Sequence, residues 1–179
     1  GVGTFLLDND GDVDLLTIQW SMITEALNDS HHEKGAHAYG GILGGLRQSV
    51  HHNLYAHLKS RAPKVTWRRH CKVDFRNNVV YNWMINNSYD GASSYMNWVN
   101  NYVKAGPATK NDVKYQVFEL FDRYDGPLDA TEDQDHETSL FAEGNFVVGA
   151  PEISADNWRG GIRFKSGANE EDHRAHEPH

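Results

Sequence analysis

The sequence has a single cysteine, Cys71, among its 179 residues, so no intrachain disulfide is available to it. Basic residues are also few: 17 Lys and Arg stand against 25 Asp and Glu, which gives a formal net charge of -8. This balance argues against a nucleic-acid partner. No apolar run approaches the length that spans a membrane, and no signal peptide opens the chain. An anionic substrate therefore requires local cations or a bridging metal, and Cys71 is expected to be a small buried strand residue.

Long helical periodicity is missing as well. In its place, four segments share an asparagine followed by three mostly apolar or aromatic residues: HHNLYAH, FRNNVVYNW, WVNNYVKAG and EGNFVVGA. The asparagines are Asn53, Asn78, Asn101 and Asn145, at spacings of 25, 23 and 44 positions. We interpret 44 as two steps of 22, with a missing repeat near Asp122. An earlier repeat is found in LLTIQWSMIT, with Ser21 in the asparagine position.

A period of about 22 to 25 residues is typical of one supersecondary unit per coil of a solenoid. The units contain strand-forming residues between polar turns. The sequence therefore predicts an all-β fold, a parallel β-helix of about seven coils, taking ~23 residues for each coil. Stacked asparagines can bond to one another through their amides, and asparagine tolerates the left-handed conformation of a tight corner. A β-sandwich with coincidental asparagine turns is the alternative.

Three segments depart from the repeat: an insertion at 28–45, a polar stretch at 125–138 and a polar tail. No linker divides the chain, so we predict one β-helical domain over residues 1–165. The tail, residues 166–179, has no apolar period and is expected to run over the surface or fray.

Two basic segments are candidates for binding or catalysis. The insertion contains HHEKGAHAYGGILGG, in which Lys34 and three histidines (His31, His32 and His37) accompany five glycines. It lacks the order of a Walker loop, and a surface loop is the simpler interpretation. The second segment, SRAPKVTWRR, places four cations after one strand: Arg61, Lys64, Arg68 and Arg69. Coils of a β-helix set equivalent positions side by side, so Lys34 is expected to face Arg61 across a groove suited to carboxylates. An Arg61 that only pins the turn, by pairing with an acidic neighbour, is equally compatible with the sequence.

An acidic turn, DNDGDVD, lies near the start of the chain and resembles the beginning of a calcium loop. Its Asp8, Asp10 and Asp12 are candidate metal ligands. The glycine is misplaced for an EF-hand, and Gln19 stands where the bidentate Glu belongs. A solvated turn is the alternative interpretation.

Several motifs in one order resemble the pectate lyases, polysaccharide lyase family 1. They are TIQWSMITEALNDSHHEKGAHAYGGILGG, HHNLYAHLKSRAPK and DFRNNVVYNW, followed by VNNYVKAGPATK and EGNFVVGAPEISADNW. The resemblance runs from about residue 15 to 160 and implies a right-handed parallel β-helix. It also implies calcium-assisted β-elimination of de-esterified polygalacturonate (pectate) by a secreted enzyme.

The resemblance assigns roles to particular residues. Arg61 falls on the catalytic arginine of the Arg-x-Pro motif, and Lys34 on the substrate-binding lysine. Lys64 matches the basic position after the proline, and Arg68 and His37 are expected to contact substrate. A second arginine that some members carry is replaced by Thr66, and Thr4 stands where another member has Glu. The resemblance implies that Asp8 is one of the calcium carboxylates, and the chain resembles the central and C-terminal part of the catalytic domain.

Other readings stay open at this stage. One is a pectin lyase that acts on methylated substrate without calcium. Another is a non-catalytic β-helix that binds acidic polysaccharide, with Arg61 only gripping a carboxylate. A hydrolase on the same kind of fold is a third. The N-terminal coil offers no helical cap, so self-association through that end is also expected.

Overall fold

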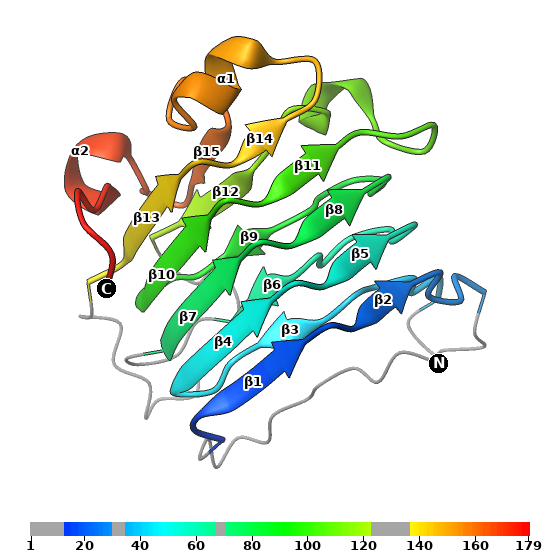
Figure 1. Ribbon diagram of the computed structural model, residues 1–179, viewed down its shortest axis with the longest axis horizontal. Helices are drawn as coiled ribbons and strands as arrows, with labels where there is room; N and C mark the ends of the chain where they lie inside the picture. Colours follow the sequence, from blue (N-terminus) through cyan, green and yellow to red (C-terminus); the bar gives the residue numbers. More distant parts are fainter. Residues whose placement is uncertain (1–12, 30–34, 67–70, 123–136) are drawn as a thin grey trace.

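The computed structural model describes residues 13–29, 35–66, 71–122 and 137–179. Their strands form three parallel sheets of five strands each, wound in a repeating order (Figure 1). Each coil contributes one strand to each sheet in turn, which is the architecture of a parallel β-helix. Three parallel sheets exclude the β-sandwich alternative.

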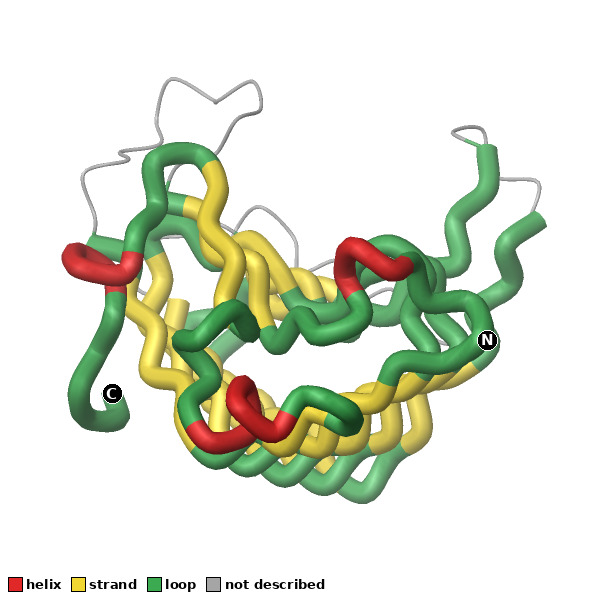
Figure 2. Tube along the Cα trace, turned by 90° about the horizontal axis from the view of Figure 1, so that it is seen from above, coloured by secondary structure: helices red, strands yellow, loops and turns green. Residues whose placement is uncertain are grey.

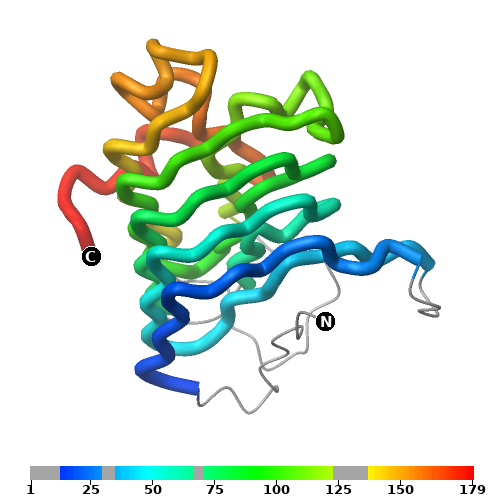
Figure 3. Tube along the Cα trace, turned by 45° about the vertical axis from the view of Figure 1, so that its right-hand side comes forward, coloured from blue at the N-terminus to red at the C-terminus, as the bar shows by residue number. Residues whose placement is uncertain are grey.

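The first sheet, sheet 1, comprises β1 (Leu16–Gln19), β4 (Arg47–His51), β7 (Cys71–Arg76), β10 (Ser94–Val99) and β13 (Ser139–Glu143). Sheet 2 comprises β2 (Met22–Thr24), β5 (Leu54–Ala56), β8 (Val79–Tyr81), β11 (Tyr102–Lys104) and β14 (Phe146–Val147). Sheet 3 comprises β3 (Ile42–Leu43), β6 (Lys64–Val65), β9 (Tyr89–Asp90), β12 (Phe118–Phe121) and β15 (Ile162–Lys165). In Figure 3 the coils rise one above another, and in Figure 2 their strands superpose.

The described residues form five coils, fewer than the seven expected. The expected repeat near Asp122 is wrong, because Phe118–Phe121 is strand β12 of sheet 3 and opens no new coil. The 44 positions between Asn101 and Asn145 span one coil: the Asn101 backbone N–H donates to the Asn145 side-chain oxygen at 3.0 Å. Loop length, rather than coil number, sets this spacing.

The polar ladder confirms the predicted stacking of asparagines. The Asn53 backbone N–H and side-chain amide both donate to Asn78 Oδ1, and Asn78 repeats this pattern toward Asn101. Ser21 opens the ladder by donating its backbone N–H to Asn53 Oδ1, as its position in the repeat predicted. Asn157 closes the ladder by accepting from Asn145, although only 12 positions separate these two residues.

The residue before each ladder member from Ser21 to Asn145, rather than the ladder residue itself, adopts the left-handed conformation at these corners. These residues are Trp20, His52, Asn77, Asn100 and Gly144, with φ between 53° and 69°. Asp156, which precedes Asn157, is extended instead. A side chain at Gly144 would place its Cβ 2.1 Å from Asn100 Oδ1, so glycine is required there. Ladder and corner together turn every coil from sheet 1 into sheet 2.

An aromatic column fills the interior between the sheets. The Phe75 and Trp98 rings stack with centroids 4.4 Å apart, and Trp98 contacts Phe118 edge-on at 4.7 Å. Tyr55 lies against Phe75 on the other side. Cys71 is buried in β7, as predicted. Packing of aromatic rings from neighbouring coils thus stabilises the interior of a chain that cannot form an intrachain disulfide.

The C-terminal end of the stack is covered by helix α1 (Pro151–Ala155), which packs on β14 (Figure 1). Residues 166–179 follow β15. They include helix α2 (Glu170–His173), whose buried His173 bonds Asp122 through Nε2 at 2.9 Å. A single 3-10 turn, Asn111–Val113, precedes β12. None of the helices in the described ranges is long and apolar enough to cross a membrane.

Candidate active site

The turn that follows β5 and precedes β6 carries the Arg-x-Pro motif between two neighbouring coils. On one side, the Lys59 N–H donates to Ala38 O at 2.7 Å, and the Gly40 N–H donates to Ser60 O at 3.0 Å. On the other side, the Ala62 N–H donates to Asn87 O at 2.7 Å. Because backbone bonds hold it from both sides, this turn is a rigid support for the side chains that leave it.

Arg61 stands at the centre of this turn in a strained conformation, with φ +64°. Its guanidinium lies 4.3 Å from the centroid of the Tyr39 ring, which belongs to the preceding coil. Its Nε is buried without a hydrogen-bond partner, and no carboxylate of the described residues pairs with the guanidinium. The structural alternative, in which an acidic neighbour pins Arg61, therefore finds no partner among the described residues.

Gly40 makes the close approach of the two coils possible. A Cβ at this position would lie 2.2 Å from Arg61 O and 2.7 Å from Leu58 Cδ1. The next residue, Gly41, donates its N–H to Arg61 O at 2.8 Å. Gly40 and Gly41 thus hold the backbone of Ser60 and Arg61, which gives these two glycines of the insertion a structural purpose that the sequence left open.

Lys64, at the start of β6, has a partner that the sequence did not reveal. Its Nζ lies 3.0 Å from Asp90 Oδ2, and the Asp90 side chain is only 7% exposed. Desolvation raises the pKa of Asp90, against the opposing effects of Lys64 and of the nearby N–H groups of Gly91 and Ala92. Asp90 Oδ1 is buried without a well-formed hydrogen bond. The charge of Lys64 is therefore partly compensated, whereas Arg61 has no compensating carboxylate in the part of the chain that the structure describes.

His37 is brought to the same region. Its ring lies 4.6 Å from the Tyr39 ring, and its Nδ1 is 3.0 Å from Gly35 O. Arg61, Tyr39 and His37 thus form one continuous surface, with the Lys64–Asp90 pair beyond the proline. Tyr39 and Asp90 were missed as site residues, because only the pairing of coils reveals which residues flank Arg61.

The remaining predicted site residues lie outside the described part of the chain. They are Lys34, Arg68, Asp8, Asp10 and Asp12. Within ranges 13–29, 35–66, 71–122 and 137–179, no group of three or more His, Cys, Asp or Glu side chains is arranged to hold a metal ion. The described residues alone therefore do not fit a calcium site, and the calcium prediction rests on the three aspartates.

Comparison with known proteins shows which proteins this chain resembles. No protein-family model matches it. It is 36% identical over 106 residues to a probable pectate lyase C of Aspergillus fumigatus, an alignment covering 55% of this chain and 22% of that protein. A probable pectate lyase C of Aspergillus flavus is 33% identical over 135 residues, covering 68% and 29%. The chain contains a pectate lyase-like region.

A third pectate lyase relative, from Neosartorya fischeri, is 37% identical over 107 residues. Across these three relatives the chain spans between 22% and 29% of their length. The pectate lyase resemblance of the sequence is thus confirmed at the level of a region.

Proposed function

We propose that this chain is the β-helical part of a secreted pectate lyase that cleaves de-esterified polygalacturonate by β-elimination. The observation that carries the proposal is Arg61, a strained cation without a carboxylate partner among the described residues, held on a rigid turn. The names of the relatives supply the reaction class. The net charge of -8 makes such a cation significant, because an anionic polymer must find positive charge locally.

The proposed chemistry begins at C-5 of a galacturonate unit, where a proton lies next to the carboxylate. The base takes this proton, the C-5–H electron pair forms the C-4–C-5 double bond, and the C-4–O bond breaks. The leaving oxygen departs with the other half of the chain and is protonated by solvent. Arg61 is proposed as the base and takes the proton in its neutral form, becoming the guanidinium cation in this step. No carboxylate of the described residues holds it in an ion pair.

The other residues are proposed to orient the substrate. Lys64 can approach a uronate carboxylate while Asp90 limits its motion, since the two lie 3.0 Å apart. Tyr39 supports the guanidinium plane at 4.3 Å and restricts where Arg61 points. Lys34, Arg68 and His37 remain proposed substrate contacts.

Calcium, when bound, would supply electrostatic stabilisation of the charge that develops on the uronate carboxylate. Asp8, Asp10 and Asp12 are the proposed ligands. No catalytic step is assigned to the metal, because the described residues do not provide a site for it.

The test is an assay for the unsaturated product. We expect incubation with polygalacturonate at alkaline pH to raise the ultraviolet absorbance of the 4,5 double bond, and a calcium chelator to abolish the rise. Faster cleavage of methylated pectin, insensitive to the chelator, would replace the proposal with a pectin lyase. Binding without any product would leave a non-catalytic polysaccharide-binding β-helix, and new reducing ends without absorbance would identify a hydrolase.

A further inference from the structure

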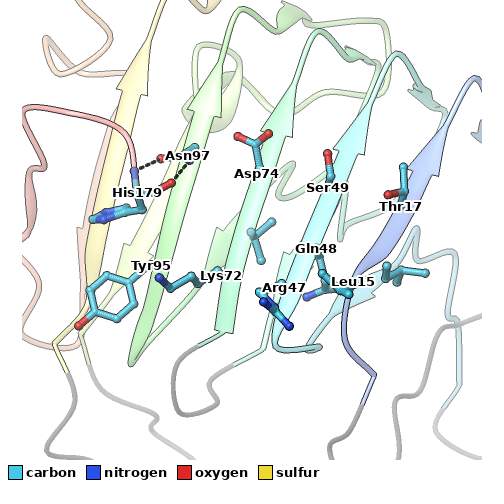
Figure 4. A pocket seen from close by; sticks show the side chains of 12 residues that line it. Leu15, Thr17, Arg47, Gln48, Ser49, Lys72, Asp74, Tyr95, Asn97 and His179 are labelled. Carbon is cyan, nitrogen blue, oxygen red and sulfur yellow. Dashed lines mark hydrogen bonds between the residues drawn. The ribbon is translucent and has the colours of Figure 1, made fainter.

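A hollow lies on the outer face of sheet 1, away from the turn that carries Arg61. Its volume is about 370 Å³, and it is lined by residues from β1, β4, β7 and β10 together with His179 (Figure 4). Arg61 lies between sheets 2 and 3, so the two sites occupy different faces of the stack.

Strand register arranges the lining of this hollow in two parallel rows. One row carries hydrogen-bonding side chains from four successive coils: Thr17, Ser49, Asp74 and Asn97. The other row carries Arg47, Lys72 and Tyr95 from three coils. Neighbouring strands lie about 4.8 Å apart, so the first row presents a donor or acceptor at each step along the hollow.

Lys72 is the cation that remains available here. Arg47 is paired with Asp14, and Arg76 with Asp74. Lys72 forms no ion pair with any residue in the described part of the chain, and its Nζ lies 5.8 Å from the centroid of the Tyr95 ring. The hollow therefore has a positive end at Lys72, beside an aromatic ring, and an acceptor-rich row next to it.

The C-terminal residue His179 closes one side of the hollow. Asn97 Oδ1 accepts from the His179 N–H at 3.0 Å, and Asn97 Nδ2 donates to His179 O at 3.3 Å (Figure 4). The imidazole lies edge-on to Tyr95 at 5.1 Å. Burial, followed by the charge of Lys72, lowers the pKa of His179 against an opposing effect of Glu137. Because Arg47 is held by Asp14, Lys72 is the cation of this lining that has no ion-pair partner among the described residues.

We propose that this hollow is a second binding site, for a uronate unit of an acidic saccharide. The sugar carboxylate meets Lys72, its hydroxyl groups bond Asp74 and Ser49 on the same and the preceding coil, and its ring lies against Tyr95. A small inorganic anion would leave the hydroxyl-bonding row unused, and a neutral sugar would leave Lys72 without a counter-charge. The choice of galacturonate as the uronate rests on the proposed function, but binding at this site does not require cleavage.

The test is a titration with digalacturonate, followed by NMR signals of Ser49 and Tyr95. We expect these signals to titrate, and Lys72→Met to weaken the titration at least tenfold. The matched control is Lys104→Met, because Lys104 lies 5.7 Å from the Tyr81 ring on sheet 2 in a similar cation–aromatic contact. This control, like Arg61→Lys, is expected to leave the Ser49 and Tyr95 titration unchanged.

Two outcomes would overturn the site. One is the absence of any Lys72-dependent titration by digalacturonate. The other is an equal response to the neutral disaccharide of galactose. Failure of the proposed function has a different signature, namely no unsaturated product from polygalacturonate while the Lys72-dependent signals still titrate.

Discussion

At the scale of single residues, Arg61 differs from Lys64 in having no acidic partner within the described ranges of the chain. The Lys64 ammonium pairs with a carboxylate, while the Arg61 guanidinium faces an aromatic ring. Two cations three positions apart can therefore have separate tasks. A variant that keeps the charge of Arg61 but changes its shape can distinguish between its candidate roles.

Arg61→Lys is expected to lower kcat by about 10²- to 10⁴-fold if Arg61 is the base. This corresponds to about 3 to 5 kcal/mol of barrier at 1.36 kcal/mol for each factor of ten. The Kd for an oligogalacturonate should rise less, because lysine still meets a carboxylate. Steady-state kinetics, a binding titration and a melting curve on one variant check this prediction.

The alternatives give opposite patterns. A residue that only grips substrate would lose affinity and keep kcat at saturation. A residue that only pins the turn would lower the melting temperature with little change in either constant.

At the scale of elements, the β5–β6 turn depends on a neighbouring coil for its shape. Gly40→Ala would press a methyl group against Arg61 O, which lies 2.2 Å from the ideal Cβ position. Overpacking of this kind destabilises by about 1 to 3 kcal/mol. We expect kcat to fall at least tenfold as well, because the support of Arg61 shifts.

Gly41→Ala is the control for this effect. An added Cβ at Gly41 meets no atom within 4 Å, and the variant keeps the N–H that bonds Arg61 O. It should retain wild-type kinetics and stability. Equal damage from both substitutions would show that alanine is harmful anywhere in the insertion, and the claim of a specific contact at Gly40 would fail.

The asparagine ladder is a second element whose contribution can be measured. Asn78→Ala would leave the Asn53 N–H and the Val50 carbonyl without their buried partners. Each such loss costs about 1 to 3 kcal/mol, so the two together are expected to destabilise the protein by roughly 2 to 6 kcal/mol in chemical unfolding. Asn111→Ala, on an exposed 3-10 turn, should change the free energy of unfolding by less than about 0.5 kcal/mol. A similar small change for Asn78→Ala would contradict a supporting role for the ladder.

The ladder also explains how far the sequence could predict the fold. Asparagine spacing was sufficient for Asn53, Asn78 and Asn101, because the loops between them are similar in length. It misjudged the interval to Asn145, where a long loop lies within one coil, and it missed Asn157, which lies beyond a helix. The number of residues between ladder members depends on loop length, whereas each hydrogen-bonded step of the ladder from Ser21 to Asn145 connects one coil to the next.

The candidate site was likewise only partly predictable from the sequence. The proline two positions after Arg61 indicated a turn, and the resemblance to pectate lyases indicated Arg61 and Lys64 as site residues. The sequence did not predict Tyr39 or Asp90 as site residues, because the pairing of neighbouring coils brings them next to Arg61 and Lys64. Asp90 also has a left-handed backbone conformation, with φ +80°. No local pattern in the sequence encodes either property.

At the scale of the whole molecule, the two ends of the stack differ. Helix α1 covers the last coil, whereas β1, β2 and β3 have partner strands on one side only within the described residues. Unpaired strand edges promote association with other chains. We therefore expect this chain to self-associate, with an average mass in analytical ultracentrifugation that increases with concentration.

A strand-blocking variant tests the origin of this association. Ile18→Pro removes a backbone donor from β1, the end strand of sheet 1. Reduced association of a still-folded variant would support pairing through this edge. A wild-type chain that stays monomeric at all concentrations would contradict the prediction.

The ladder has a consequence for how such a protein can change. Ladder neighbours make the same amide contacts whether 12, 23, 25 or 44 positions separate them. Insertions and deletions elsewhere in a coil therefore leave the ladder hydrogen bonds between coils unchanged. Loops bearing the recognition chemistry can lengthen, shorten or be exchanged between relatives while the scaffold keeps its pitch, so specificity and architecture are free to evolve on separate tracks.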